Sequence, residues 1–251
     1  MTSTNPTTRQ TLGAAAVVAL GLAAAGALAG AGVARVRTAD RTVTVRGLSE
    51  REARADLAIW PLRLVAADND LAAANAQLAR SLATVRTFLR AQGLDSARGT
   101  EVVLQNFEVA DAATNQYGGA QGGGSRFVIR QTVIVRSPEP AAVQAASQRV
   151  AELVSAGVVL TSGGEYGQGG PTFVFTGLNA LKPAMIAEAT ARAREGAEQF
   201  ARDSRASLAG IRRASQGVFE ILPRDQAPGI TAEGQLVKTV RVVTTVEYGL
   251  R

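Results

Sequence analysis

The sequence predicts an α+β protein in which repeated strand–helix–strand units form largely antiparallel sheets covered by helices, preceded by one N-terminal transmembrane helix. Three observations lead to this prediction. Apolar periodicity alternates between about two and about 3.6 residues in three successive rounds along residues 41–251. An uncharged apolar run of 22 residues, from Leu12 to Val33, precedes this body. No glycine-rich stretch carries the motif of a nucleotide-binding fold.

The apolar run divides the N-terminal part of the chain. We expect a tail at residues 1–11, a transmembrane anchor at 12–34 and a linker at 35–40. A spanning helix needs about 20 apolar residues, so the run is long enough. The alternative is a cleaved signal peptide, with small-residue sites at 27–29 or 32–34. The run exceeds the roughly 7 to 15 residues of a signal core, which favours the anchor.

The first strand–helix–strand unit begins directly after the linker. Val43 and Val45 alternate with polar residues, which is typical of a half-buried strand. Asn69 or Asp70 can cap the following helix, and Gly93 can end it. The expected order is a strand at 41–47, a strand at 55–70, a helix at 69–93 and a strand at 100–110.

Two further units follow the same pattern. In the second, Ser137 is the expected helix cap and Pro138 the first helical residue. Its elements are a strand at 125–136, a helix at 137–157 and a strand at 158–164; the third unit has a strand at 171–177, a helix at 179–208 and a strand at 211–223. A closing strand at 238–250 places Val240, Val242, Thr244, Val246 and Tyr248 on one face, which predicts a central strand paired on both sides.

Trp60 and Pro61 interrupt the second strand. Proline cannot donate a ladder hydrogen bond, so it is confined to sheet edges and bulges. Leu57 and Ile59 share one face, and Leu62 and a further leucine at 64 lie on the other, which suggests a bulge at this dipeptide. We therefore expect a packed tryptophan beside a bulge or an edge. The alternative is an edge used for contact between subunits.

The positive charge does not indicate nucleic-acid binding. Of 27 basic residues, all but Lys182 and Lys238 are arginine. Residues 1–38 contain three arginines and no acid, which leaves 24 basic and 21 acidic residues, a net charge of +3, in the remainder. No basic block interleaved with aromatic residues occurs, and nucleic-acid binding requires such a footprint.

The residue types also argue against an enzyme. The chain has no histidine and no cysteine, which removes the commonest general base, the thiolate nucleophile and the usual zinc ligands. Paired carboxylates remain, but the candidates are interpreted as solvated, ion-paired surface. They are Glu50, Glu52 and Asp56, then Glu188, Arg192, Glu195 and Arg202, and finally Asp203, Ser204 and Ser207. The loops at 116–126 and 162–171 lack a phosphate-binding motif and are interpreted as flexible connections. We expect no catalytic, metal-binding or cofactor-binding residue.

Four stretches of the body resemble the SIMPL-domain family. They are "DRTVTVRGLSEREARADLAIWPLRLVA", "PTFVFTGLNALKPAMIAEATARAREGAEQFA", "RRASQGVFEILPRD" and "KTVRVVTTVEYGL". The resemblance covers about residues 40–250 and is closest to the membrane-anchored branch. These are bacterial envelope proteins, described as oxidative-stress defence or periplasmic immunogenic proteins, or as proteins of unknown function. Some relatives assemble into rings. The family has no established catalytic residues to transfer to this chain.

The resemblance implies a location and a function class. Loop charges leave the orientation open, and the family's envelope location implies a single-pass inner-membrane protein, held through residues 12–33, with its C-terminal body in the periplasm. The expected function is that of a membrane-tethered, non-enzymatic homo-oligomer that supports envelope integrity or stress tolerance. The alternative is a periplasmic binding module for a peptide or small ligand.

Overall fold

The computed structural model describes residues 18–28, 41–114, 125–161 and 170–251. The predicted tail, the linker and the two ends of the predicted anchor lie outside these residues. The helix at 18–28 is about 16 Å long, against a hydrocarbon core of about 30 Å. No helix in the described ranges has the length and hydropathy required to cross a membrane. The prediction of a single-pass inner-membrane protein with a periplasmic body is therefore wrong.

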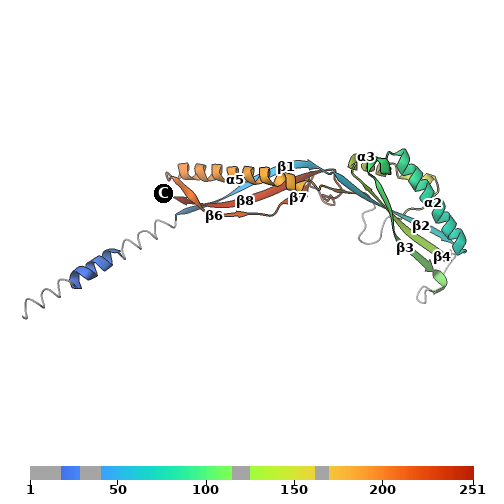
Figure 1. The fold of residues 1–251 in the computed structure, drawn as a ribbon, viewed down its shortest axis with the longest axis horizontal. Helices are drawn as coiled ribbons and strands as arrows, with labels where there is room; N and C mark the ends of the chain where they lie inside the picture. Colours follow the sequence, from blue (N-terminus) through green and yellow to red (C-terminus); the bar gives the residue numbers. More distant parts are fainter. Residues whose placement is uncertain (1–17, 29–40, 115–124, 162–169) are drawn as a thin grey trace, which may run out of the picture. The chain divides into compact units, whose positions relative to one another are not determined.

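The chain has a mixed α+β fold with antiparallel sheets, as the sequence predicts (Figure 1). Contacts between residues divide it into two compact units. Unit 1 comprises the described residues within 1–49, 185–218 and 242–251, and unit 2 comprises those within 50–184 and 219–241. Three long elements contribute residues to both units: β1 (Thr42–Arg54), α5 (Leu178–Asp203) and β8 (Val237–Leu250).

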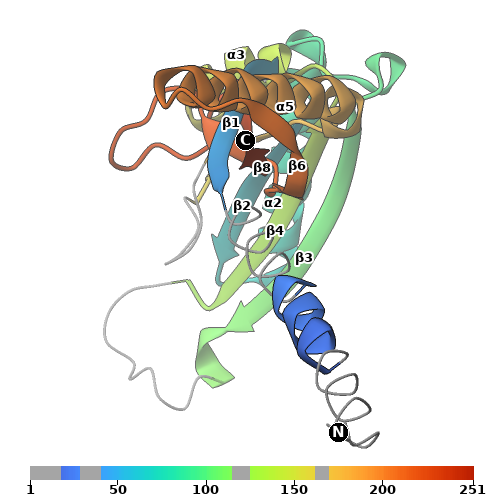
Figure 2. The same ribbon diagram turned by 90° about the vertical axis from the view of Figure 1, so that its left-hand side faces the viewer.

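Unit 2 contains a four-stranded antiparallel sheet in the order β3-β4-β2-β5. Its strands are β2 (Leu57–Asp68), β3 (Glu101–Asp111), β4 (Phe127–Ser137) and β5 (Thr172–Val174). The long helix α2 (Leu71–Ala91) packs on β2 and β4, and α3 (Pro140–Gln148) packs on β2. The short helix α4 (Ala151–Ser155) contacts α2. Strand β3 lies at one edge of this sheet and, among the described residues, pairs only with β4 (Figure 2).

The core of unit 2 lies between the sheet and α2. Every second residue of β2 is buried, and Val85 and Leu89 of α2 belong to the same cluster. Trp60 is 1% exposed, which confirms that it is a core residue. Asp70 caps α2 by accepting a 3.0 Å hydrogen bond from the Ala73 N–H. The buried β2 residues are Ala58, Trp60, Leu62, Leu64 and Ala66.

The predicted bulge at Pro61 is wrong, and β2 is an inner strand between β4 and β5, but Pro61 lies where the β5 side of β2 is unpaired. Pairing between β2 and β4 continues without a shift from Ala58 to Asp68, with Pro61 opposite Ile134. The Val65 N–H donates to the Val159 carbonyl oxygen, on the side away from β4. Alternate residues of a strand direct their backbone groups to the same side, so the Pro61 nitrogen also faces away from β4. Pairing with β5 ends at Ile59, so Pro61 leaves no ladder bond unmade there.

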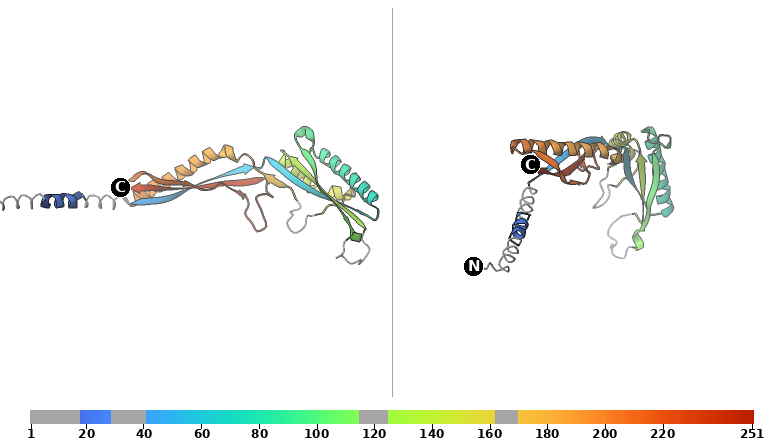
Figure 3. Two further views of the ribbon diagram at one scale, coloured as in Figure 1. Left: turned by 60° about the horizontal axis from the view of Figure 1, so that its bottom comes forward. Right: turned by 60° about the vertical axis from the view of Figure 1, so that its left-hand side comes forward.

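Unit 1 is built around β8, which lies between β1 and β6 (Leu208–Gln216). Helix α5 lies along these strands (Figure 3). A further strand, β7 (Glu220–Pro223), pairs with the part of β8 that belongs to unit 2. The predicted central position of the closing strand is confirmed, because its five alternating residues are all buried: Val240, Val242, Thr244, Val246 and Tyr248.

Strand β1 and helix α5 approach closely at Gly47. A Cβ atom at this position would lie 1.7 Å from the Ala189 carbonyl oxygen and 2.6 Å from the Ala193 nitrogen. The helix face opposite consists of buried residues at four-residue spacing, and after Met185 these are all alanines, from Ala189 to Ala201. Glycine on the strand and alanine on the helix therefore let the two backbones come into contact.

Some predicted boundaries differ from the structure. Glu139 and Pro140 begin α3, whereas Ser137 accepts a hydrogen bond from the Glu139 N–H outside the helix. The helix predicted at 137–157 breaks into α3 and α4. The strand predicted at 158–164 forms one bridge, between Leu64 and Leu160, within its described part. The strand predicted at 211–223 breaks into β6 and β7.

Candidate functional site

The carboxylates near the first hairpin make structural contacts. Glu50 forms an ion pair with Arg241, at 3.6 Å between carboxylate oxygen and guanidinium nitrogen. Asp56 accepts hydrogen bonds from the Thr176 N–H at 2.9 Å and from the Thr176 hydroxyl at 3.0 Å, which ties the start of β2 to the segment after β5. Glu52 is exposed. Glu50 and Asp56 therefore bind different partners.

The polar residues of α5 and the turn after it are also spread along the chain. Glu188 accepts a 3.0 Å hydrogen bond from the Ser49 hydroxyl, and Arg192 pairs with Glu195 at 3.9 Å. The remaining candidates bind within or next to the helix: Arg202 and Asp203 each contact Gln199, Ser204 donates to the Phe200 carbonyl oxygen, and Ser207 donates to that of Arg251. Among the described residues, no group of three acidic, histidine or cysteine side chains is placed to bind a metal.

A buried lysine anchors the loop between β7 and β8. Lys238 is 2% exposed, and its ammonium group donates to the carbonyl oxygens of Ala232 and Gln235. Burial lowers the pKa of Lys238, because the charged form loses hydration, and the nearby charge of Glu233 partly offsets this effect. The bound carbonyl oxygens give this lysine a structural role in holding the loop.

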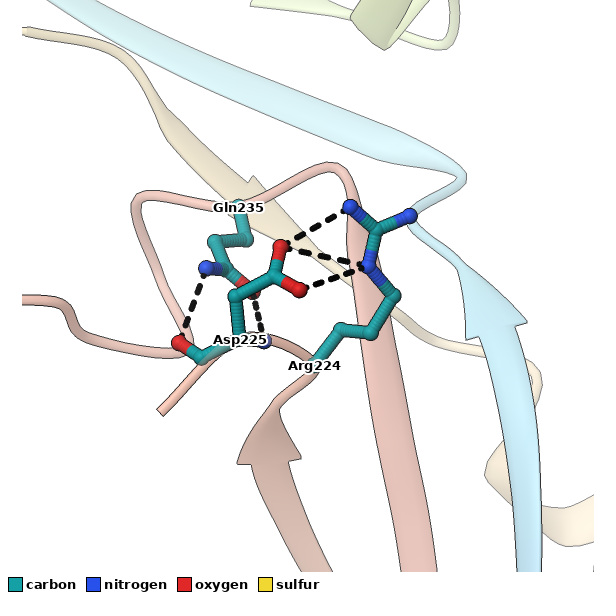
Figure 4. A network of polar contacts seen from close by, with 3 residues as sticks. All are labelled: Arg224, Asp225 and Gln235. Carbon is teal, nitrogen blue, oxygen red and sulfur yellow. Dashed lines mark hydrogen bonds and ion pairs between the residues drawn. The ribbon is translucent and has the colours of Figure 1, made fainter. Parts of the chain in front are cut away.

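The same loop is closed by a second polar network (Figure 4). The Gln235 side chain exchanges two 3.2 Å hydrogen bonds with the backbone of Asp225. The Arg224 guanidinium binds the Asp225 carboxylate, with a shortest distance of 2.8 Å, and this contact lowers the pKa of that carboxyl. The Phe173 N–H donates to the Glu233 carbonyl oxygen at 2.8 Å. These contacts hold the loop in place, and the polar groups of Arg224, Asp225 and Gln235 are used in hydrogen bonds within it.

The feature of unit 2 that is suited to contact another molecule is strand β3. It is an edge strand of 11 residues, and nine of them, Glu101–Val109, are exposed. Both of its faces carry apolar side chains. Soluble proteins usually shorten, charge or cover such edges, because unpaired backbone groups pair readily with another strand. The exposed apolar residues are Val102, Val103, Leu104, Phe107 and Val109, at 37 to 57% exposure.

The acidic residues of β3 are paired with arginines across the ladder. Glu101 lies 3.9 Å from Arg136, and Glu108 lies 3.6 Å from Arg130. The third acid, Asp111, accepts two hydrogen bonds from Arg126, and these bonds lower the pKa of Asp111. Charge on β3 is therefore largely balanced by its neighbour β4, which reduces the repulsion that a second strand would meet.

A groove of about 480 Å³ lies between α2 and the start of β3. Its walls come from the end of α2, the turn that follows it, and Val102 of β3. The lining residues are Arg86, Leu89, Arg90, Leu94, Asp95, Ser96, Thr100 and Val102. The groove therefore joins two arginines on a helix to an exposed strand edge.

The sequence analysis missed both the open edge and the groove. Apolar residues in both phases of 102–109 indicate a strand buried on two faces, which is the opposite of the observed exposure. The available signal was Glu101, Glu108 and Asp111, since charges at both ends of a short apolar strand are common on edges.

The fold thus defines an α+β protein of antiparallel sheets. The family model named SIMPL, described as a protein of unknown function (DUF541), matches residues 43–248. The match spans most of the chain, which therefore belongs to the SIMPL family. Membership confirms the family resemblance and leaves the membrane-anchored branch untested. Comparison with curated proteins gives no match.

Proposed function

We propose that this chain is a non-enzymatic protein that self-associates, and that β3 of one copy pairs with β3 of a second copy. The observation that carries the proposal is the open edge itself: a strand of 11 residues, irregular only around Asn106, exposed along most of its length, with apolar side chains on both faces. A role in envelope integrity or stress tolerance would then follow from assembly rather than from a reaction.

Antiparallel pairing about a two-fold axis suits this strand. An isologous contact uses the same surface on both copies, so a single exposed edge is sufficient for a dimer. Such pairing would bring Glu101 of each copy toward Asp111 of the other. Their arginine partners, Arg136 on β4 and Arg126 directly before it, lie at 3.9 and 3.2 Å and reduce the resulting repulsion. Backbone hydrogen bonds and the exposed valines would supply the attraction.

The edge strand of unit 1 is a useful contrast. Strand β6 also has an exposed face, but its pairing with β8 shifts twice, on either side of Ile211, whereas the pairing of β3 with β4 shifts once, between Gln105 and Glu108. Arg212 and Arg213 follow this irregularity. Bulges and charges are the features that prevent an edge from pairing. We therefore assign self-association to β3 and not to β6.

The test is the molar mass of the full chain, measured by light scattering after size exclusion. Val103 is 45% exposed on the β3 edge, and Ile211 is 55% exposed on β6. Val103→Lys places a charge on the proposed contact, so its mass should fall to that of one chain, 25.9 kDa. The matched control Ile211→Lys should keep the parent mass. Both variants retain residues 12–33, so association through that run contributes equally.

Two results would reject the proposal. One is a parent chain that remains at 25.9 kDa throughout the accessible concentration range. The other is a Val103→Lys chain whose mass equals that of the parent.

A further inference from the structure

The groove between α2 and β3 has an unbalanced charge. Arg86 and Arg90 lie four residues apart on α2, so both side chains emerge on the same face of the helix. Helix α2 contains three arginines and no acidic residue. Neither arginine of the groove has an ion pair with a described residue; the Arg90 Nε donates only to the Arg86 carbonyl oxygen, at 3.3 Å.

The acid in the groove, Asp95, forms no ion pair with these arginines, and its single negative charge leaves the three groups with a net positive charge. The Asp95 carboxylate accepts a 3.1 Å hydrogen bond from the Arg98 N–H, at the start of a short 3₁₀ turn. Its backbone carbonyl oxygen accepts a 3.0 Å bond from the Thr100 N–H. Asp95 is thus used to shape the turn, and the groove retains two cationic groups.

The opposite wall offers an edge for an extended chain. Val102 and Leu104 pair with Val135 and Val133, two core residues of β4, and so lie on the sheet face that α2 covers. Both remain more than a third exposed, because α2 packs on β2 and β4 and does not extend over β3. A strand added at this edge would place every second side chain beside the arginines and the two apolar residues.

We infer that the α2–β3 groove binds an extended acidic segment of a partner protein, which adds to the edge of β3 and places its carboxylates against Arg86 and Arg90. The charge of the groove specifies the occupant: carboxylates suit two guanidinium groups that have no ion pair with a described residue. This inference goes beyond self-association, which needs neither arginine. The two events would compete for the same strand edge.

The arginines have a simpler structural explanation, which the experiment must separate. Cations near a helix C-terminus interact favourably with the helix dipole, and Arg90 lies in the last turn of α2. Such a role would affect helix stability and would not distinguish acidic from basic peptides. Discrimination between peptides of opposite charge is therefore the decisive measurement.

The probe is a fluorescein-labelled peptide that alternates glutamate with valine, and its match has lysine in place of glutamate. Fluorescence anisotropy measures the binding of both to the full chain at low and moderate salt. The test variant carries Arg86→Glu and Arg90→Glu. The control is Arg80→Glu, which alters an exposed arginine of the same helix outside the groove.

We expect the parent chain to bind the glutamate peptide and to release it as salt rises, because exposed charges are screened. The double variant should bind that peptide at least tenfold more weakly and should now prefer the lysine peptide, whereas Arg80→Glu should behave as the parent. Failure of the parent to bind, equal binding of both peptides, or equal losses in the control and the double variant would overturn the inference. The mass of the double variant, which should equal the parent mass, tests self-association separately.

Discussion

At the scale of single residues, the structure explains why the early strand contains the sequence Val45-Arg46-Gly47. A side chain at position 47 would overlap the backbone of α5 at Ala189 and Ala193. Backbone atoms cannot move aside as a flexible side chain can, so glycine is required by packing and not by backbone conformation. The contact lies entirely within unit 1.

Gly47→Ala should therefore destabilise the protein strongly, by about 3 kcal/mol or more, because it overpacks a contact between two backbones. Chemical denaturation measures this change. The matched control is Gly196→Ala on α5, where a Cβ would meet only Val45 Cγ1, at 4.0 Å. Gly196→Ala should stabilise by about 0.5 to 1 kcal/mol, the usual gain in a helix interior. Equal effects of the two substitutions would contradict the close approach.

At the scale of elements, the ladder between β3 and β4 carries a titratable contact at its end. Hydrogen bonds from Arg126, together with one from the Ala113 N–H, lower the pKa of Asp111 below its ordinary 3.8. At a pH just below 3.8, Asp111 is therefore protonated to a greater extent in the unfolded chain than in the folded chain. The stabilisation is fully present above pH 3.8 and is lost as pH falls through the lowered folded pKa.

Asp111→Asn should thus flatten the acid limb of the stability curve. Between about pH 5 and about pH 2.5, the thermal midpoint of the parent should fall further than that of Asp111→Asn. Arg126→Gln removes the main cause of the shift, so Asp111→Asn should add little in that background. Parallel curves for the parent and Asp111→Asn would show that this ion pair does not contribute to folding.

The elements also show how far the sequence determines the fold. Local signals correctly predicted α2, with Asp70 as its cap and Gly93 in a left-handed conformation after its end. The alternation of β8 predicted its central position. The break between β6 and β7 was missed, although Gly217 marks it: a Cβ there would lie 2.8 Å from the Val243 carbonyl oxygen.

The remaining errors concern partners rather than local conformation. A strand is an edge because topology gives it one neighbour, and its own residues indicate this only indirectly, here through the charges at the ends of β3. Val102 and Leu104 are consequently apolar in sequence and exposed in the structure. Pro61 was assigned a bulge because Leu57 and Ile59 were taken as the core face, whereas the core face of β2 contains Trp60. The candidate interface is therefore a property of the fold.

At the scale of the whole molecule, the account rests on one claim: the open β3 edge pairs with a second copy. The chain has no cysteine, so a single introduced cysteine reports its own contacts alone. Across a two-fold axis, each β3 residue has a fixed separation from its equivalent, and disulfide geometry is satisfied only within about 7 Å between Cα atoms.

The most direct measurement is a cysteine scan of positions 102–109 in the full chain under mild oxidation, with Ser215→Cys on β6 as control. The account predicts that disulfide-linked dimer peaks at one or two neighbouring positions near the middle of β3 and falls toward both ends. The control should remain monomeric on a non-reducing gel. Uniformly weak cross-linking along β3, or a yield no greater than that of Ser215→Cys, would contradict it.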